Sequence, residues 1–209
     1  MYNYKIIDNF LNKDDFTRLS SLDLKEIEKN EIKIFHNKIF KNGNVQGQCL
    51  DADFIKILFK NYHDAAMDLL NIFSPKKTKL WEYSEFHIVQ TGSNYKYPIH
   101  RDSPLKLLSG VIYLKPAQSK GTLLYETKNG KNPKEITWKQ NRGFFFARSE
   151  NNSYHSYEGD GKSTRVALVY NLMTTKLKEV CEIENISYYK IRTREFINPY
   201  FYRFFKILF

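Results

Sequence analysis

The sequence has few cysteines and no long apolar run. Its 209 residues include two cysteines, Cys49 and Cys181, which stand too far apart to match a zinc or redox motif. No stretch reaches the roughly 18 consecutive apolar residues of a membrane-spanning helix. The first residues, MYNYKIIDNFLNKDD, lack the apolar region of a secretion signal. These absences argue against a disulfide framework and a membrane span, and they predict a reduced, cytoplasmic setting.

The chain also lacks a contiguous basic block, although basic residues are in excess. Its 33 lysines and arginines exceed 23 acidic residues, for a net charge of +10, but they are spread over the whole chain. The excess allows an anionic partner such as nucleic acid or anionic lipid without identifying one. With 42% hydrophobic and 16% aromatic residues, the composition excludes a disordered chain and predicts one folded domain, 1–209.

The region 1–78 is predicted to combine short strands and helices. KIIDNFLNKDDFTRLSSLDL predicts a strand and then a helix that starts near Asp14 or Asp15. Asn42-Gly43 suits the tight turn of a hairpin. Residues 51–73 have the clearest helical pattern of the chain, because apolar residues recur at helical spacing: Phe54, Leu58, Tyr62, Ala65, Leu69 and Phe73.

After Pro75 the pattern changes to short apolar or alternating runs. They are LWEYSEFHIVQ, LLSGVIYLKP, GTLLYET, GFFFARS and RVALVYNLM, separated by turns rich in Gly, Asn and Ser. Such runs are typical of a sandwich or barrel of antiparallel strands. We therefore expect an α+β fold in which residues 79–175 form the β core and the N-terminal helices pack on the outside of one sheet.

The C-terminal extension, 176–209, ends in EFINPYFYRFFKILF, where aromatic residues stand beside Arg203 and Lys206. We predict a final helix with Asn198 as its cap and Pro199 at its first position. Such a helix can pack on its own domain, lie on a membrane surface or join two copies of the chain. A homo-oligomer formed through this tail is thus one of the expected arrangements.

Four polar residues suggest a metal site with an anion-binding arginine. In YPIHRDSP, His100 and Asp102 are two positions apart, so in a strand they point to one side and Arg101 to the other. His155 follows in a polar loop, and Arg165 opens the next strand. Two imidazoles and a carboxylate form the facial triad of non-heme Fe(II) oxygenases, which leaves positions open for a 2-oxo acid and dioxygen. A hydrolytic zinc site would use the same ligands but would leave the arginine unexplained.

The stretch from about 83 to 173 resembles the 2-oxoglutarate- and Fe(II)-dependent dioxygenase superfamily, in its prolyl-4-hydroxylase-like branch. The matching pieces, in the family's order, are YPIHRDSP, LLSGVIYLKP, KGTLLYE, KQNRGFFFARSENNSYHS and STRVALVYNL. The resemblance implies a double-stranded β-helix, or jelly-roll, core that carries the catalytic site. It also implies an enzyme that uses Fe(II) and 2-oxoglutarate, with ascorbate as an optional reductant.

Carried over residue by residue, the resemblance makes His100, Asp102 and His155 the iron ligands. Arg165 would pair with the distal carboxylate of 2-oxoglutarate, where a planar guanidinium gives a two-pronged match. Because Asp102 is present, the chain does not resemble the halogenase subgroup, which has a small residue there.

Two further positions are assigned to the co-substrate. Tyr113 matches a tyrosine that hydrogen-bonds the same carboxylate in the oxygen-sensing prolyl hydroxylases. Those enzymes have another tyrosine ten residues before the first histidine ligand, and Gln90 stands there in this chain. We therefore expect a modified pocket or a shifted loop at Gln90. His87 alternates out of phase with Gln90, so we expect it to be structural or exposed.

The predicted reaction is the hydroxylation of a C–H bond with release of succinate and carbon dioxide. Tyr95, Lys96, Tyr97, Lys106 and Arg148 predict a basic, aromatic mouth. We expect a peptidyl proline or another small polar molecule as substrate.

Two alternatives remain open. One is oxidative demethylation of nucleic acid, which the net charge allows. Superfamily members with that activity resemble each other in a second arginine six residues after the co-substrate arginine, and Asn171 occupies this position here. The other is a catalytically silent jelly-roll module that binds a partner, for which the four site residues would be superfluous.

Overall fold

The structure is a computed structural model. It describes residues 3–150 and 153–205, with side chains as far as residue 197. The first elements are β1 Tyr4–Ile7, α1 Lys13–Ser20, β2 Ile32–Phe35, β3 Lys38–Phe40, β4 Val45–Gln46, α2 Ala52–Phe73 and the 3-10 helix η1 Pro75–Leu80. Then follow β5 Tyr83–Thr91, β6 Lys96–His100, β7 Lys106–Lys115, β8 Thr122–Tyr125, β9 Lys134–Ile136, β10 Gly143–Phe146, β11 Tyr154–Glu158 and β12 Arg165–Met173. The last described elements are α3 Leu177–Glu184 and α4 Tyr188–Phe205.

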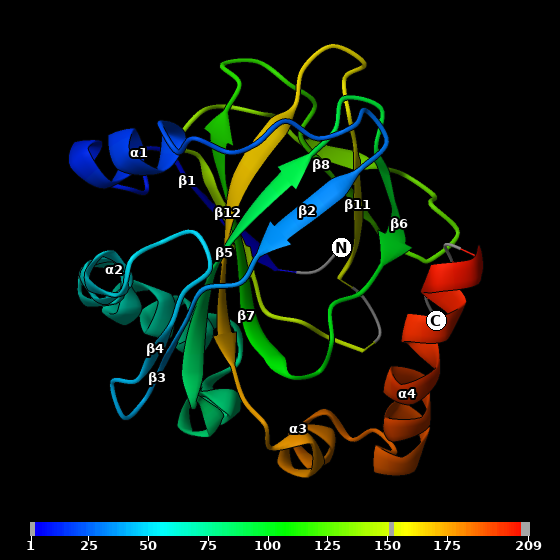
Figure 1. Ribbon diagram of the computed structural model, residues 1–209. Coiled ribbons are helices and arrows are strands. Elements are labelled where there is room, and N and C mark those ends of the chain that lie inside the picture. Colours follow the sequence, from blue (N-terminus) through cyan, green and yellow to red (C-terminus); the bar gives the residue numbers. More distant parts are fainter. Residues whose placement is uncertain (1–2, 151–152, 206–209) are drawn as a thin grey trace.

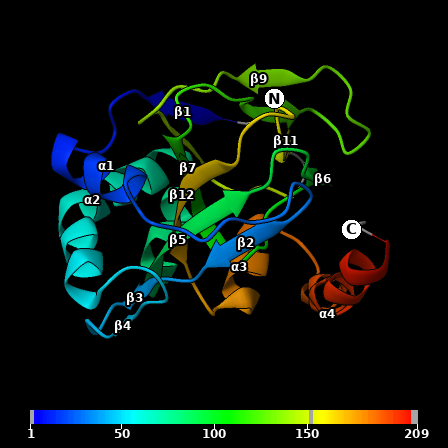
Figure 2. The same cartoon turned by 45° about the horizontal axis from the view of Figure 1, so that its top comes forward.

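The described strands form two antiparallel sheets. An eight-stranded major sheet has the order β1-β10-β7-β12-β5-β3-β4, and β2 also pairs with β5. A four-stranded minor sheet has the order β6-β11-β8-β9. In Figures 1 and 2, α1 and α2 lie together at the left of the molecule and α4 lies at the right. The arrangement confirms the predicted α+β class.

The two faces of the major sheet differ because side chains alternate along β5 and β12. Even-numbered residues such as Phe86, Ile88 and Leu168 are buried in the main apolar core. Helix α2 covers this face and buries Phe54 and Leu58 in the same core, where each buried side chain stabilises the fold by about 2 kcal/mol. Odd-numbered residues of both strands face the other way, into a cavity that residues of the minor sheet also line.

Most predicted elements of the N-terminal region are confirmed. Helix α2 starts after Asp51, whose carboxylate accepts a hydrogen bond from the backbone N–H of Phe54 at 2.8 Å. One position of its predicted apolar face is wrong: Ala66 is buried and Ala65 is exposed. The turn of the predicted hairpin has Gly43 at a φ of 85°, which glycine adopts without strain.

The predicted start of the final helix is wrong. Helix α4 begins eleven residues earlier, at Tyr188, and the backbone remains helical through Asn198 and Pro199. The oxygen of Ser187 accepts a hydrogen bond from the backbone N–H of Lys190 at 3.4 Å, so Ser187 serves as the cap. Residues 206–209, and the side chains from 198 onward, lie outside the described residues, and contact between copies stays a prediction. No helix within the described ranges is both long and apolar enough to cross a membrane.

Candidate active site

Three predicted metal ligands converge at the junction of β6 and β11. His155 is the direct partner of His100 in the pairing of these strands, and their ring centroids are 4.2 Å apart. Asp102 follows the end of β6, and one ligand atom from each of the three residues lies within 4.8 Å of the others. The prediction that His155 lies in a loop is wrong. It lies within β11, whose inner face is polar because it borders a cavity rather than the apolar core.

Hydrogen bonds orient both imidazoles for metal binding. Nδ1 of His100 lies 3.0 Å from the Pro98 carbonyl, and Nδ1 of His155 lies 3.0 Å from the Ser153 carbonyl. Because a carbonyl only accepts, Nδ1 carries the hydrogen in each ring. The lone pair of each Nε2 is then available for a metal ion, and the carbonyls fix the ring orientation.

The charge state of the three ligands also suits a divalent cation. Burial, reinforced by the neighbouring His155, lowers the pKa of His100 to about 3. Burial lowers the pKa of His155 as well. Burial alone would raise the pKa of Asp102, but the charge of Lys106 and the two imidazoles outweigh it and hold this pKa well below its ordinary value. Near neutral pH the site is two neutral imidazoles and one carboxylate, so a metal ion displaces no proton from them.

Asp102 is held on both of its oxygens. Oδ1 accepts a hydrogen bond from Nζ of Lys106 at 2.8 Å, and Oδ2 accepts one from Oγ of Ser109 at 2.6 Å. Both donors lie on β7. The carboxylate is therefore fixed by the major sheet, whereas the imidazoles belong to the minor sheet.

Arg165 is a buried cation at one end of the same cavity, which has a volume of about 350 Å³. It is 4% exposed, and its guanidinium lies 4.5 Å from the ring centroid of Tyr157 and 5.0 Å from that of Trp138. Burial lowers its pKa, although a guanidinium stays charged. Its Nη1 has no hydrogen-bond partner among the described residues. Since a buried charge is costly without a counter-charge, Arg165 is suited to an anionic ligand.

The structure does not bring the hydroxyl of Tyr113 or the amide of Gln90 to this cavity. The Tyr113 hydroxyl donates a hydrogen bond to Oγ1 of Thr122 at 2.9 Å and accepts one from the Thr122 N–H at 3.0 Å. Gln90 is an even-numbered residue of β5 and faces away, and its Nε2 donates to the Lys25 carbonyl at 3.1 Å. The ring of Tyr113 nevertheless lies 5.4 Å from the Arg165 guanidinium, and contact of either residue with 2-oxoglutarate stays a prediction.

Sequence reasoning missed a polar wall at the other end of the cavity. His87, expected to be structural or exposed, is 7% exposed, so it is not exposed; it is held by polar neighbours and also lines the cavity. Its Nε2 lies 3.3 Å from Oε2 of Glu85 and 3.2 Å from Nδ1 of His36. Asn171 Nδ2 donates to the same Glu85 oxygen at 3.0 Å. The two-residue spacing of Glu85 and His87 was the available signal, but it does not show which face of β5 meets the cavity.

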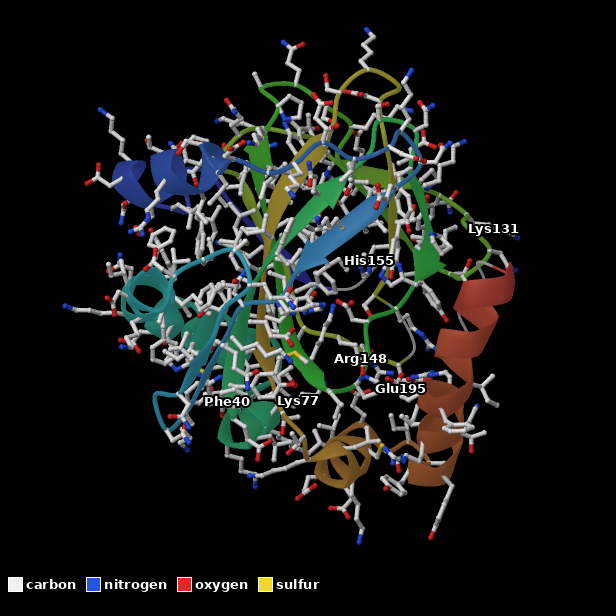
Figure 3. The ribbon with its side chains drawn as sticks, viewed as in Figure 1. Phe40, Lys77, Lys131, Arg148, His155 and Glu195 are labelled. Carbon is white, nitrogen blue, oxygen red and sulfur yellow. The ribbon has the colours of Figure 1, made fainter. Side chains whose placement is uncertain are left out.

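The predicted basic mouth is wrong for Arg148. This side chain is fully buried, and its Nε donates to the backbone carbonyl of Asp102 at 3.3 Å. In Figure 3, Arg148 lies between His155 and Lys77, inside the molecule. Lys106 does line the cavity, but its charge is engaged by Asp102.

Arg148 belongs to a buried cluster of charges that joins the C-terminal helices to the site. It forms ion pairs with Glu184 of α3 and with Glu150. Lys77 Nζ lies 2.6 Å from Oε1 of Glu184, and Arg194 of α4 lies 2.8 Å from Oε1 of Glu150. The segment that leads into β11 is therefore fixed to α3 and α4 through charges.

Glu85 gives the protein a predicted sensitivity to acid. Burial alone would raise the pKa of Glu85. The hydrogen bond and charge of His87, together with Asn171 and Lys106, outweigh burial and lower this pKa to about 2. The carboxylate therefore stabilises the folded state above about pH 4.5, and this stabilisation is lost as the pH falls toward 2. Between pH 7 and pH 3, we expect the free energy of unfolding of Glu85→Gln to fall by on the order of 2 kcal/mol less than that of the unmodified protein. Urea unfolding of both proteins between pH 7 and pH 3 measures it, and parallel curves would contradict it.

Comparison with known proteins rests on the fold. No protein-family model matches the chain, and no curated protein does. A prolyl-4-hydroxylase of Pseudomonas putida matches with a TM-score of 0.54 at 14% identity, over 83% of this chain and 94% of that one. An oxidoreductase of the 2OG-Fe(II) oxygenase family from Burkholderia pseudomallei matches with a TM-score of 0.55 at 15% identity, over 81% and 84%.

A third match is a prolyl hydroxylase from Trichoplax adhaerens, solved in complex with a peptide fragment of the hypoxia inducible factor oxygen degradation domain. Its TM-score is 0.55 at 16% identity, over 86% of each chain. All three cover more than four fifths of this chain. The chain therefore has the jelly-roll fold that these 2OG-Fe(II) oxygenase and prolyl hydroxylase structures share.

Proposed function

We propose that the protein is a 2-oxoglutarate-dependent dioxygenase that hydroxylates a C–H bond of its substrate. The observation that carries this proposal is the pairing, in one cavity, of the His100, Asp102 and His155 cluster with the unpartnered Nη1 of Arg165. A metal site alone fits hydrolysis equally well. A buried guanidinium beside it calls for an organic anion, and 2-oxoglutarate provides a carboxylate at each end.

In this function the three ligands hold Fe(II), whose chemistry when bound is the activation of dioxygen. Arg165 binds the distal carboxylate of 2-oxoglutarate through charge-assisted hydrogen bonds. The rings of Tyr157 and Trp138 beside it exclude water and strengthen that interaction. Each turnover consumes one 2-oxoglutarate and one dioxygen, and one oxygen atom enters succinate while the other becomes the new hydroxyl group. Carbon dioxide is the third product.

For the substrate we propose a peptidyl proline or another small polar molecule. The peptide bound by the Trichoplax adhaerens enzyme supports a peptide as the ligand class. Apolar side chains of β2, Ile32 and Ile34, line the cavity together with the polar wall. Oxidative demethylation of nucleic acid is the alternative, and turnover of a methylated single-stranded oligonucleotide would favour it.

The proposed setting is the cytoplasm. Cys49 and Cys181 are both free thiols, and a reducing compartment keeps thiols and iron in their reduced forms. Ascorbate would serve there as an optional reductant.

The test compares two arginine variants. Arg165→Leu is expected to weaken 2-oxoglutarate binding by about 30-fold or more, because it removes one partner of a buried charge pair. Arg142→Leu is the control, since Arg142 pairs with Asp8 at the surface, and it should bind as the unmodified protein does. The measurement is an anaerobic titration of the Fe(II)-loaded protein with 2-oxoglutarate, followed by its weak visible charge-transfer band. If the band is absent in the unmodified protein, or if Arg165→Leu binds 2-oxoglutarate as tightly as the unmodified protein does, the proposal is wrong.

A further inference from the structure

Besides Arg165 Nη1, a second buried polar atom of the cavity lining has no hydrogen-bond partner among the described residues, and this second atom is an acceptor rather than a donor. Asn171 is 1% exposed and lines the cavity, and its Oδ1 has no hydrogen-bond partner among the described residues. Arg165 Nη1 is an unpartnered donor, whereas Asn171 Oδ1 is an unpartnered acceptor. A buried polar atom left without a partner costs about 1–3 kcal/mol, so each of them favours a ligand that completes it.

The orientation of the Asn171 amide follows from chemistry. Glu85 Oε2 lies 3.0 Å from Nδ2 of Asn171, and a carboxylate can only accept. The NH₂ group must therefore face Glu85, and Oδ1 must be the free end. Glu85 is itself fixed by His87 at 3.3 Å and Lys38 at 3.5 Å. The acceptor is thus held in one direction by a network on β5 and the neighbouring β3.

The position of Asn171 places this acceptor next to the metal ligands, on the side away from Arg165. Within the major sheet Asn171 is the direct partner of Ser109, and Ser109 donates its hydroxyl to Asp102 at 2.6 Å. Arg165 lies six residues earlier on the same strand, which is about 20 Å along a β-strand. The metal ligands therefore lie between a site for the 2-oxoglutarate carboxylate and a separate acceptor.

We propose that Asn171 determines substrate specificity by accepting a hydrogen bond from an amide N–H of the substrate. This rests on the proposed function, because Arg165 must already engage the co-substrate. The neighbouring cations Lys38 and Lys106 disfavour an ammonium group and leave a neutral donor. In a prolyl peptide the proline nitrogen has no hydrogen, so the donor is the N–H of the residue that follows the proline.

The test uses two probes that differ by one donor. N-acetyl-proline N-methylamide has a single N–H, and N-acetyl-proline methyl ester has an oxygen in its place. Binding to the Mn(II)-loaded protein with 2-oxoglutarate, without oxygen, is measured from the paramagnetic relaxation of the probe protons. We expect the amide to bind at least about 10-fold more tightly than the ester. Asn171→Leu should remove this preference, and Arg142→Leu, a substitution at the surface outside the cavity, should keep it.

Every outcome decides the proposal. Equal binding of amide and ester to the unmodified protein, binding of neither, or a preference that survives in Asn171→Leu overturns it. If Asn171→Leu does not fold, the comparison of the two probes in the unmodified protein still decides. Binding of 2-oxoglutarate in the same samples tests the proposed function separately, since its loss in the unmodified protein would overturn that function rather than the role of Asn171 alone.

Discussion

Asp102→Ala is expected to weaken divalent-metal binding by more than about 100-fold. Loss of a residue that only orients a metal ligand typically costs 10–100-fold in metal affinity, and loss of the ligand itself costs more. Ser109→Ala provides the graded comparison, because it removes only the hydrogen bond to Asp102 Oδ2. We expect about a 10-fold loss for it. The measurement is a titration with Co(II), followed by its visible absorption. Equal affinity of Asp102→Ala and the unmodified protein would remove Asp102 from the metal site.

The same substitution also affects stability, through a different contact. Lys106 Nζ lies 2.8 Å from Asp102 Oδ1, and its side chain is 26% exposed. Without Asp102 this ammonium group lacks its counter-charge, and we expect a loss of about 1–3 kcal/mol in the free energy of unfolding. The double variant with Lys106→Met should regain stability but not metal affinity. This separates the two roles of Asp102, and a double variant that regained both would contradict its role as a ligand.

Glu184→Gln is expected to destabilise the protein by about 3–5 kcal/mol. Glu184 holds two cations inside the protein: Lys77, whose side chain is 3% exposed, and the fully buried Arg148. Without the negative charge of Glu184, the buried cations Lys77 and Arg148 lose a shared counter-charge. Chemical denaturation measures the change in the free energy of unfolding.

A matched control is available at the surface. Asp8 also holds two cations, Arg142 at 2.6 Å and Lys139 at 2.9 Å, but its side chain is 38% exposed. Asp8→Asn should change stability little, because water screens an exposed pair. The second variant Glu184→Gln with Lys77→Met should recover part of the loss. Equal effects of Glu184→Gln and Asp8→Asn would show that burial of the cluster is not what stabilises it.

The β core was the most predictable part of the fold. RVALVYNLM and LWEYSEFHIVQ alternate or run apolar over enough residues to identify β12 and β5. The first run matches the bounds of β12, whereas β5 starts three residues after the start of the second run and ends one residue after its end. The segment around His155 was not recognised as a strand, because the residues that β11 turns toward the cavity, His155 and Tyr157, do not form an apolar face. The start of α4 was predicted too late, because Asn198-Pro199 is the stronger sequence signal for a helix start. Ser187, which caps the helix in the structure, gives a weaker signal in the sequence.

For the site, spacing identified the residues that converge but not those that surround them. His100 and Asp102 share one side of an extended segment, His155 and Arg165 follow in a polar segment and at the start of the next strand, and the family order agrees with all four. Alternation shows which residues share a face of a strand, whereas contact with the second sheet decides which face is the cavity. The family position of Gln90 therefore did not show which way its side chain points, and the cavity wall formed by its odd-numbered neighbours was overlooked.

The separation of the two faces of β5 and β12 has an evolutionary consequence. Substitutions at odd-numbered positions such as Ala167 or Val169 change what the cavity accepts, and those at even-numbered positions change how the sheet packs on α2. New specificities can thus arise at little cost to the scaffold. Insertion of a single residue within β12 would do the reverse, since it would exchange the two sets of side chains along the rest of the strand.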